Sequence, residues 1–249
     1  MNCVSFYNIV AVKSEPSDKS ELVTQLLFGE KYQVVEVSED KKWSRIKILF
    51  DDYIGWIDTK LVQEVDEQQW HTFSLIESEY CLEPTASVLN KQGAFYPVTF
   101  GADISALKIE GKKRVFSNIS RVAPVDEIPS IAKSFLNTPY LWGGKTHFGI
   151  DCSGLTQQVL KVAGVKIPRD AYQQAEVGEG VSFEDREYGD LVFFKNEEGR
   201  IHHVGMITDK NKIIHAHGVV RLDKIDEDGI FDTEREIYTH TFYSIRRMY

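Results

Sequence analysis

The sequence predicts an α+β fold in which small all-β barrels precede a domain of helices packed on one side of an antiparallel sheet. Short segments rich in β-branched and aromatic residues fill the first 124 residues, with turn residues between them. After residue 125, two helical patterns come before a run of strand-like segments. Helices followed by strands in this way are typical of α+β domains.

The composition describes a globular chain with an acidic charge balance. The chain has 249 residues, 42% of them hydrophobic, and a formal net charge of −9. This length allows two or three small domains with packed cores. Because the charge is negative and no apolar run is long enough to span a bilayer, we expect a monomer with no nucleic-acid and no membrane partner.

The N-terminus and the cysteines bear on where the protein works. Residues 1–6 lack a basic region followed by a long apolar core, so they do not look like an export signal. We therefore expect a cytoplasmic protein, with a secreted one as the alternative if the chain has been trimmed. The three cysteines, Cys3, Cys81 and Cys152, are too few and too scattered to suggest a disulfide framework.

Five strand-like segments predict a first small barrel in residues 1–66. We expect Trp43 and Trp56 in its core or lining a groove. The run Val23-Thr24-Gln25, followed by Gly29-Glu30 and Gly55-Trp56-Ile57, resembles bacterial SH3-like domains. The five segments are Ile9–Val12, Leu22–Leu27, Tyr32–Val37, Trp43–Phe50 and Tyr53–Ile57.

Residues 67–124 repeat this pattern more faintly, which predicts a second, degenerate SH3-like barrel. Turns are expected at 91–93 and 110–112, and a linker at 121–125. The expected strands are Phe73–Ile76, Cys81–Glu83, Val88–Leu89, Tyr96–Phe100, Ile104–Ile109 and Arg114–Phe116.

Residues 125–249 are predicted to form the third domain. A helix is expected over 126–136, with Pro129 in its first turn. Four strands follow the second helix, and the turn at 209–212 suits a hairpin between two of them. The strands are Leu191–Phe194, Val204–Ile207, Lys212–Ala216 and Tyr243–Met248.

Cys152 is a candidate nucleophile because of its place in the chain. It follows a glycine-rich loop, and from Leu155 the apolar residues recur with helical spacing until Gly164. Cys152 should therefore lie in the first turn of a helix, where free N–H groups and the helix dipole stabilise a thiolate. The alternative is a buried structural cysteine.

Two histidines are candidates for the base and for the group that orients it. His203 and His215 lie on the two strands of the predicted hairpin, which would bring them side by side. His217 has the same strand parity as His215 and is its rival. Cys152, His203 and His215 could supply three zinc ligands, but no paired ligand spacing appears elsewhere, so we expect no metal and no cofactor.

Four ordered motifs carry a resemblance to the NlpC-type family of papain-like cell-wall peptidases, over about residues 126–249. They are Tyr140-x-Trp142-Gly143-Gly144, Asp151-Cys152-Ser153-Gly154, Gly189-Asp190-Leu191-Val192-Phe193-Phe194 and His203-Val204-Gly205. The resemblance implies a papain-like fold, with Cys152 as nucleophile, His203 as base and His215 as its orienter. It also implies that Tyr140 donates to the oxyanion beside the Cys152 N–H; simple packing beside Trp142 is the alternative.

A subgroup of this family has N-terminal SH3-like domains and cleaves small murein peptides. The resemblance implies that Asp170 binds a free amino terminus and that Tyr53 closes the pocket, with Asp151, Ser153 and Trp142 also at the substrate. The alternative role for Asp170 is a helix N-cap. The sequence departs from the subgroup at two places: Ala171 replaces a serine, and Val23 stands where a glutamate is expected.

The sequence therefore predicts a cysteine endopeptidase that hydrolyses the γ-D-glutamyl–L-diamino acid bond of murein peptides with a free N-terminal L-alanine, in cell-wall recycling. The alternatives are a secreted wall hydrolase, an amidase or acyltransferase on the same scaffold, and a non-catalytic cell-wall binding protein.

Overall fold

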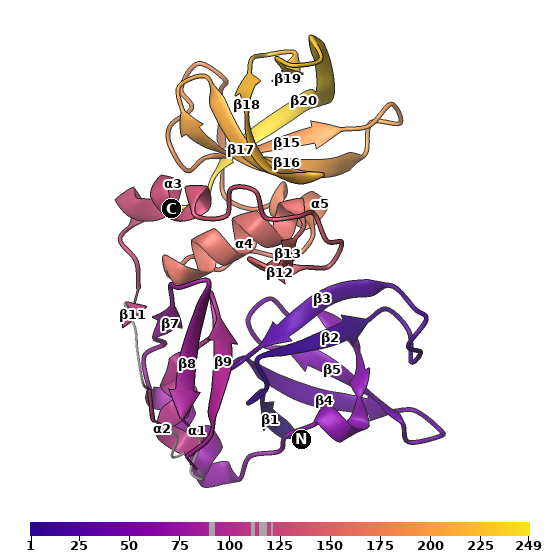
Figure 1. The fold of residues 1–249 in the computed structure, drawn as a ribbon. Coiled ribbons are helices and arrows are strands. Elements are labelled where there is room, and N and C mark those ends of the chain that lie inside the picture. Colours follow the sequence, from indigo (N-terminus) through magenta and orange to yellow (C-terminus); the bar gives the residue numbers. More distant parts are fainter. Residues whose placement is uncertain (90–92, 111–112, 115–118, 121) are drawn as a thin grey trace. The chain divides into compact units, whose positions relative to one another are not determined.

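The computed structural model of the chain describes residues 1–89, 93–110, 113–114, 119–120 and 122–249 (Figure 1). The chain divides into two compact units. Unit 1 holds Met1–Val122 together with Trp142–Thr146, and unit 2 holds Ala123–Leu141 and His147–Tyr249. Within the described residues, no helix has the length and apolar character needed to cross a membrane.

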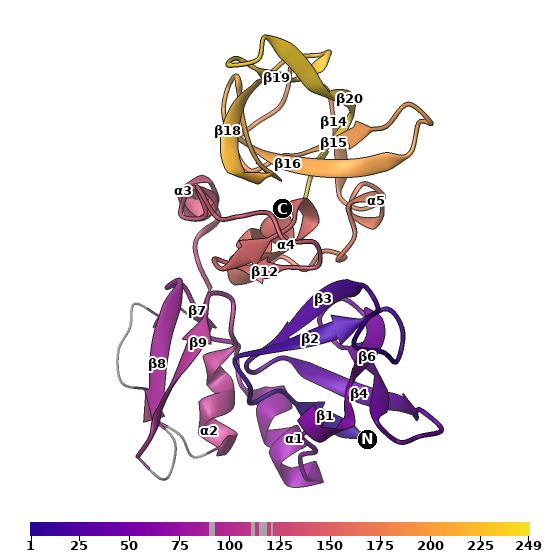
Figure 2. The ribbon, with the colours of Figure 1, turned by 45° about the vertical axis from the view of Figure 1, so that its right-hand side comes forward.

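Unit 1 begins with a six-stranded antiparallel sheet that curls into a small barrel (Figure 2). The five strands predicted for this region are confirmed, and a short β1 adds a sixth. Its core contains Cys3, Tyr32 and Ile46. The strands are β1 (Asn2–Val4), β2 (Ile9–Lys13), β3 (Leu22–Leu27), β4 (Lys31–Val37), β5 (Trp43–Ile48) and β6 (Ile54–Asp58), in the order β1-β4-β5-β6-β2-β3.

The rest of unit 1 differs from the prediction in two places. The strand expected over Ile104–Ile109 is wrong, because these residues form η2 (Ile104–Ala106) and most of α2 (Leu107–Glu110). The other difference lies at the start of this region. A strand was expected over Phe73–Ile76, but α1 (Glu67–Leu75) runs through most of it. Asp66 caps α1, since its carboxylate accepts from the N–H of Gln69 at 2.7 Å and the Gln69 side chain accepts from the N–H of Asp66. This reciprocal cap, together with burial of Phe73 on the core, makes the helix the stable local structure.

The strands that follow form two small sheets, of order β10-β8-β9 and β11-β7. In the described part of residues 67–122 they do not close into a second six-stranded barrel. The predicted turns at 91–93 and 110–112, the end of the strand 114–116 and the start of the linker at 121 lie wholly or partly outside the described residues. The elements are η1 (Thr59–Leu61), β7 (Tyr80–Cys81), β8 (Thr85–Leu89), β9 (Phe95–Thr99), η2 (Ile104–Ala106), α2 (Leu107–Glu110), β10 (Lys113–Arg114) and β11 (Ile119–Ser120).

A buried ion pair ties the Trp142–Thr146 segment into unit 1. The ammonium group of Lys145 lies 3.0 Å from Oε1 of Glu30, and their side chains are 1% and 3% exposed. The backbone N–H of Lys145 also donates to Oε1 of Gln25 at 2.8 Å, while Oε2 of Glu30 accepts from the N–H of Leu27. A buried charge needs such partners, because desolvation would otherwise be costly.

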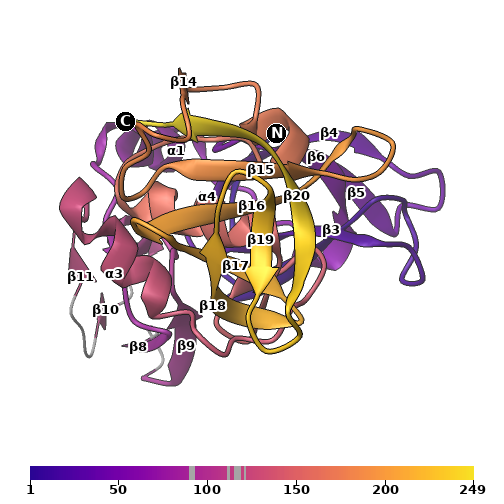
Figure 3. The ribbon, with the colours of Figure 1, turned by 90° about the horizontal axis from the view of Figure 1, so that it is seen from above.

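Unit 2 consists of three helices on one side of a seven-stranded antiparallel sheet, as the sequence predicts (Figure 1). The sheet has the order β14-β20-β15-β16-β17-β18-β19, and a further pairing of β19 with β20 makes it curl on itself (Figure 3). The four predicted strands are confirmed as β15, β16, β17 and β20; β14, β18 and β19 were not predicted. Val192, Phe194 and Ile213 belong to its buried core.

The bounds of these elements are as follows. They are η3 (Val125–Glu127), α3 (Ile128–Lys133), β12 (Lys145–Thr146, in unit 1), β13 (Gly149–Ile150), α4 (Cys152–Val162), α5 (Ala171–Gln174), β14 (Glu179–Val181), β15 (Leu191–Lys195), β16 (Ile201–Asp209), β17 (Lys212–His217), β18 (Val219–Ile225), β19 (Gly229–Asp232) and β20 (Ile237–Arg247).

The division into two units leaves the predicted boundaries 1–66, 67–124 and 125–249 as predictions. The first falls inside unit 1, where the barrel and the residues after it have separate core clusters. The second lies close to Ala123, where unit 2 begins, but Trp142–Thr146 belong to unit 1 although they follow that boundary in the chain.

Candidate active site

Cys152 is the first residue of α4, as the sequence predicts, and Asp151 caps the helix. Oδ1 of Asp151 accepts from the N–H of Gly154 at 2.7 Å. The helix begins here because the aspartate satisfies an N–H that has no partner within the first turn. The whole of α4 is buried, and it packs against β16, so Cys152, the predicted nucleophile, lies on a packed element.

Arg169 fixes the two residues that flank Cys152. Its Nη1 and Nη2 donate to Oδ1 and Oδ2 of Asp151 at 3.0 and 2.6 Å, and Nη1 also donates to Oγ of Ser153 at 2.8 Å. Arg169 is buried, so this two-pronged pair is shielded from water. The carboxylate of Asp151 and the hydroxyl of Ser153 are thus engaged inside unit 2, and their predicted contact with substrate stays a prediction.

The Cys152 thiol is protonated in the free protein. Burial raises its pKa to about 12, and the nearby Asp151 carboxylate acts in the same direction. The Val204 N–H, Arg169 and the Ser153 N–H act in the opposite direction but do not outweigh burial. The predicted lowering of this pKa by the start of the helix is therefore wrong for the free protein, since sequence alone does not show how deeply the sulfur is buried.

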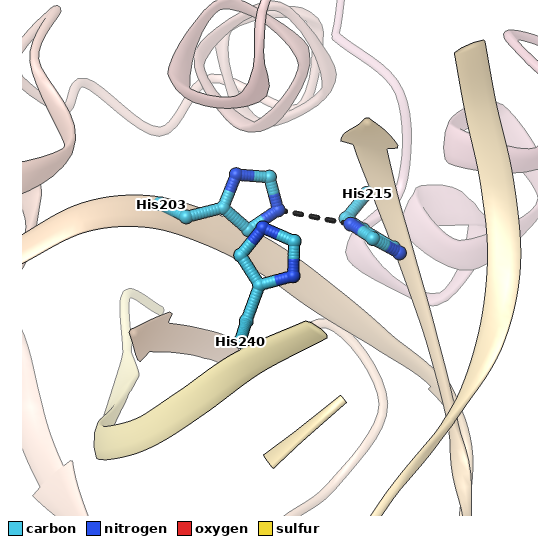
Figure 4. A group of neighbouring side chains, drawn as sticks. All are labelled: His203, His215 and His240. Carbon is cyan, nitrogen blue, oxygen red and sulfur yellow. Dashed lines mark hydrogen bonds between the residues drawn. The ribbon is translucent and has the colours of Figure 1, made fainter. Parts of the chain in front are cut away.

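His203 and His215 are neighbours, as the predicted hairpin requires. Residues Asp209 and Lys212 pair at the turn of the hairpin, and Gly205 pairs with His215 further along. Nε2 of His203 lies 2.9 Å from Nδ1 of His215 (Figure 4). The structure thus brings His215 to the proposed base; the ring of its rival His217 stands 6.2 Å from that of His215, at the exposed end of β17.

Asp223, on β18, continues this hydrogen-bonded series and was not predicted. Nε2 of His215 lies 2.8 Å from Oδ2 of Asp223, and Arg221 donates to both carboxylate oxygens. Burial alone would raise the pKa of Asp223, but the hydrogen bonds from His215 and Arg221 lower it overall. Asp223 is therefore ionised at neutral pH and can only accept, which fixes the direction of the whole series.

The direction of these bonds assigns a proton to each ring. His215 donates from Nε2 to Asp223, so its Nδ1 carries a lone pair and accepts from Nε2 of His203. Nδ1 of His203 then carries a lone pair, as the predicted role of a base requires. Burial, followed by the neighbouring His215, lowers the pKa of His203 well below 6.5, so the ring is neutral in the free protein.

A third buried histidine, His240 on β20, packs against this pair and was also missed by the sequence reading. Its ring stacks on that of His203, with centroids 4.1 Å apart and 25° between the planes. Burial lowers the pKa of His240 to about 3. No local motif marks it; only the pairing of β20 with β15 brings it to the site.

The remaining predicted residues are distributed over both units. Tyr140 is half-buried in unit 2, its N–H donates to the Gly218 carbonyl at 2.8 Å, and burial, then Cys152 and Asp151, raise the pKa of its hydroxyl. Asp170 is half-buried and precedes α5; its N–H donates to Gln173 at 3.3 Å, which is one half of a capping box. Tyr53 and Trp142 belong to unit 1. The predicted roles of these residues stay predictions.

Two protein-family models and several curated proteins match the sequence of this chain. A model of the NlpC/P60 family matches residues 137–237, and one of the bacterial dipeptidyl-peptidase SH3 domain matches residues 13–61. Over 220 residues the chain is 31% identical to a γ-D-glutamyl-L-lysine dipeptidyl-peptidase of Bacillus subtilis (strain 168), covering 78% of this chain and 71% of that protein. Over 133 residues it is 32% identical to the Escherichia coli (strain K12) murein DD-endopeptidase MepS/murein LD-carboxypeptidase, covering 52% and 70%.

A solved structure shares the fold along the whole chain. The crystal structure of an NlpC/P60 family protein from Bacillus cereus ATCC 10987 matches with a TM-score of 0.78 and 19% identity, over 100% of this chain and 99% of that one. At that identity the match shows the fold alone. The sequence match to the Bacillus subtilis relative is closer and spans more than two thirds of it, and with it the chain belongs to the NlpC/P60 family of cysteine peptidases, with a bacterial SH3-like region ahead of the catalytic unit.

Proposed function

We propose that the protein is a cysteine endopeptidase that hydrolyses the γ-D-glutamyl–L-diamino acid bond of murein peptides whose N-terminal L-alanine is free. One observation carries the proposal: Cys152 begins a buried helix that packs against β16, where His203 starts a hydrogen-bonded series to His215 and Asp223. The Bacillus subtilis relative, named for the γ-D-glutamyl-L-lysine bond, supports the choice of bond.

The geometry supports general-base activation of the thiol. Cys152 is protonated and His203 neutral, so Nδ1 of His203 takes the thiol proton as Sγ attacks the γ-carbonyl carbon. The imidazolium of His203 that forms donates a hydrogen bond to His215. His215 in turn donates to Asp223, so the negative carboxylate lies on the far side of the His215 ring and stabilises the positive charge. His203 then protonates the leaving amine of the diamino acid, and water releases the acyl group from Cys152.

The oxyanion of this reaction needs donors. The Cys152 N–H lies at the start of α4, where backbone donors are free of partners within the helix. Burial, with Cys152 and Asp151 nearby, raises the pKa of the Tyr140 hydroxyl, so the hydroxyl keeps its proton and can donate it to an oxyanion. We assign Tyr140 this second donor role.

Selection of a free amino terminus rests on Asp170. Asp170 is half-buried and directly precedes α5, and we assign its carboxylate to the ammonium group of the substrate. A charge-assisted hydrogen bond of this kind contributes about 1.5–3 kcal/mol. Tyr53 and Trp142, both in unit 1, stay predicted substrate contacts, as the family resemblance implies.

Product analysis by mass spectrometry tests the proposal. The full chain is incubated with L-Ala-γ-D-Glu-diaminopimelate, with the same peptide acetylated at its amino group, and with the lysine analogue. We expect release of the free diamino acid, a rate lower by at least about tenfold on the acetylated peptide, and no release by Cys152→Ala. Cleavage of acetylated peptide or purified sacculi at the same rate would contradict the recycling role.

A second candidate function comes from the Escherichia coli relative, whose name describes cleavage of DD bonds and an LD-carboxypeptidase activity in murein. A cross-linked muropeptide added to the same assay separates the two, because only a DD-endopeptidase would release its two halves. A cytoplasmic site of action is part of the proposal, and fractionation of cells with an antibody to this chain tests it.

A further inference from the structure

Three buried imidazoles meet beside the nucleophile, one more than the reaction uses. His203, His215 and His240 lie on β16, β17 and β20, and one ring nitrogen of each lies within 4.8 Å of the others (Figure 4). The third ring is edge-on to His215, with centroids 5.6 Å apart, and stacked on His203. The proposed reaction moves protons between Cys152, His203 and the substrate, and it assigns no step to His240.

Hydrogen bonds decide which nitrogen of His240 carries a lone pair. The Thr239 hydroxyl donates its single proton to the Ile230 carbonyl at 3.3 Å. Its oxygen therefore accepts from Nδ1 of His240, which lies 2.9 Å away. Nε2 of His240 is left with a lone pair, and Figure 4 shows that nitrogen turned toward His203.

Two nitrogens with lone pairs thus lie near one N–H group. Nδ1 of His215 carries a lone pair because its Nε2 donates to Asp223, and Nε2 of His203 carries the proton between them. A histidine held from behind by a carboxylate is a common arrangement at zinc sites, because the carboxylate orients the ring and makes its free nitrogen more basic. Asp223 is in that position behind His215.

We propose that these three histidines form an inhibitory site for a divalent transition-metal ion of the zinc type, bound by Nε2 of His203, Nδ1 of His215 and Nε2 of His240. Imidazole nitrogens suit Zn²⁺, which often has three protein ligands and one open position. With Zn–N bonds of about 2.0–2.1 Å, tetrahedral ligands stand about 3.3 Å apart. The pair now at 2.9 Å needs to open slightly, and His240 must move closer and turn out of its stack on His203, because a bound ion lies in the plane of each ligand ring.

Occupation of this site would stop the reaction by changing a tautomer. A metal on Nε2 of His203 displaces the proton there, and a neutral ring then carries its one proton on Nδ1. Cys152 would face a donor in place of an acceptor, so its thiol proton would have nowhere to go. No proton is gained or lost by the ring, and removal of the metal restores the original tautomer. This inhibition rests on the proposed function; the binding of metal does not.

Calorimetric titration of ZnCl₂ into metal-free, full-length Cys152→Ala protein tests the binding. Removing the thiol excludes it as a ligand. We expect one Zn²⁺ per chain. The affinity should be weaker by at least about tenfold in Cys152→Ala/His240→Phe, where a phenyl ring replaces the imidazole and the ligand nitrogen is lost. The matched control is Cys152→Ala/His202→Phe. His202 is exposed and its ring stacks 5.8 Å from His240, but it is not in the proposed set, so its affinity should stay within about twofold.

Several outcomes would overturn the site: no binding, unchanged affinity in the His240→Phe protein, or an equal loss in the His202→Phe protein. His240→Gln is a second variant, and near-ultraviolet circular dichroism checks that both remain folded. Co²⁺ in place of Zn²⁺ reports on sulfur, because a thiolate–cobalt band in the wild type that disappears with Cys152→Ala would assign the metal to the thiol. In the active protein we expect inhibition by Zn²⁺ that EDTA reverses. Metal binding without peptidase activity would leave the site standing and refute the proposed function.

Discussion

Nε2 of His215 lies 2.8 Å from Oδ2 of Asp223, and this one hydrogen bond sets the proton positions at the active site. The carboxylate is buried and ionised, so it can only accept. Because His215 must donate to it, His215 accepts from Nε2 of His203, and Nδ1 of His203 is left with a lone pair. A residue that touches neither Cys152 nor His203 therefore determines whether His203 can act as a base.

Asp223→Asn should lower kcat by about 100-fold while KM changes little. An amide can donate to His215, which allows the opposite tautomer and leaves His203 without an acceptor for the thiol proton. Steady-state kinetics on L-Ala-γ-D-Glu-diaminopimelate measure the effect. Asp232→Asn is the control, since Asp232 also contacts Arg221, at 3.4 Å; a similar loss there would point to general disruption.

Arg169→Met should lower the free energy of unfolding by about 3–5 kcal/mol, because it leaves the Asp151 carboxylate buried without its cation at the start of α4. Urea denaturation followed by tryptophan fluorescence measures the change. Arg200→Met provides the comparison: Arg200 pairs with Glu198 in an exposed position and should cost at most about 1 kcal/mol. Equal losses in the two variants would show that the buried pair stabilises the fold no more than an exposed pair does.

The rate of Cys152 alkylation by iodoacetamide should rise about tenfold per pH unit through the neutral and mildly alkaline range. Burial raises the pKa of this thiol to about 12, so the reactive thiolate is a small fraction that grows with each unit of pH. A Cys3→Ser/Cys81→Ser protein isolates the one thiol for mass spectrometry. A rate that is already flat near neutral pH would instead indicate a thiolate–imidazolium pair formed before substrate binds.

Stability should fall as the pH drops below 6.5, in part through His147. Its ring stacks on Phe135 at 3.7 Å, and burial lowers its pKa to about 4. Because the folded pKa is below the unfolded value of 6.5, protons bind the unfolded chain first, and the contribution of the neutral ring is lost between pH 6.5 and about 4. His147→Leu should flatten the dependence of Tm on pH over this range.

Thermal denaturation at about pH 7.5 and about pH 5 measures that difference. His71→Leu is the matched control, because His71 is exposed on α1. This substitution should leave the dependence of Tm on pH as it is in the wild type. If His147→Leu and the wild type lose stability in parallel, other groups are responsible for acid sensitivity in this range.

Local patterns predicted the parts of this fold that depend on neighbours in sequence. Segments rich in β-branched and aromatic residues predicted β2–β6, helical spacing predicted α4, and the turn at 209–212 predicted the hairpin that pairs His203 with His215. The helix α1 was missed because its apolar residues, such as Trp70 and Phe73, are sparse, and its stability comes from the cap at Asp66. The strand assigned there covered only the end of the helix.

The rest of the site depends on contacts between distant segments. Asp223 reaches His215 because β18 pairs with β17, and His240 reaches His203 through the return of β20 to the sheet. Arg169 directly precedes the predicted substrate residue Asp170, yet its pairing with Asp151 appears only once the loop after α4 folds back. The pKa of Cys152 was predicted in the wrong direction because burial, which the sequence does not give, outweighs the effect of the helix start.

The ion pair between Lys145 and Glu30 has a consequence for how such proteins recombine in evolution and in the laboratory. A fragment beginning at residue 123 would contain the whole peptidase motif and also Lys145, a cation with a buried side chain, but would lack the carboxylate that neutralises it. We therefore expect an exchange of the N-terminal module to be tolerated best when the incoming barrel brings an acid at the position of Glu30, or when Lys145 changes with it. On this argument the two residues should change together, although 115 positions separate them along the chain.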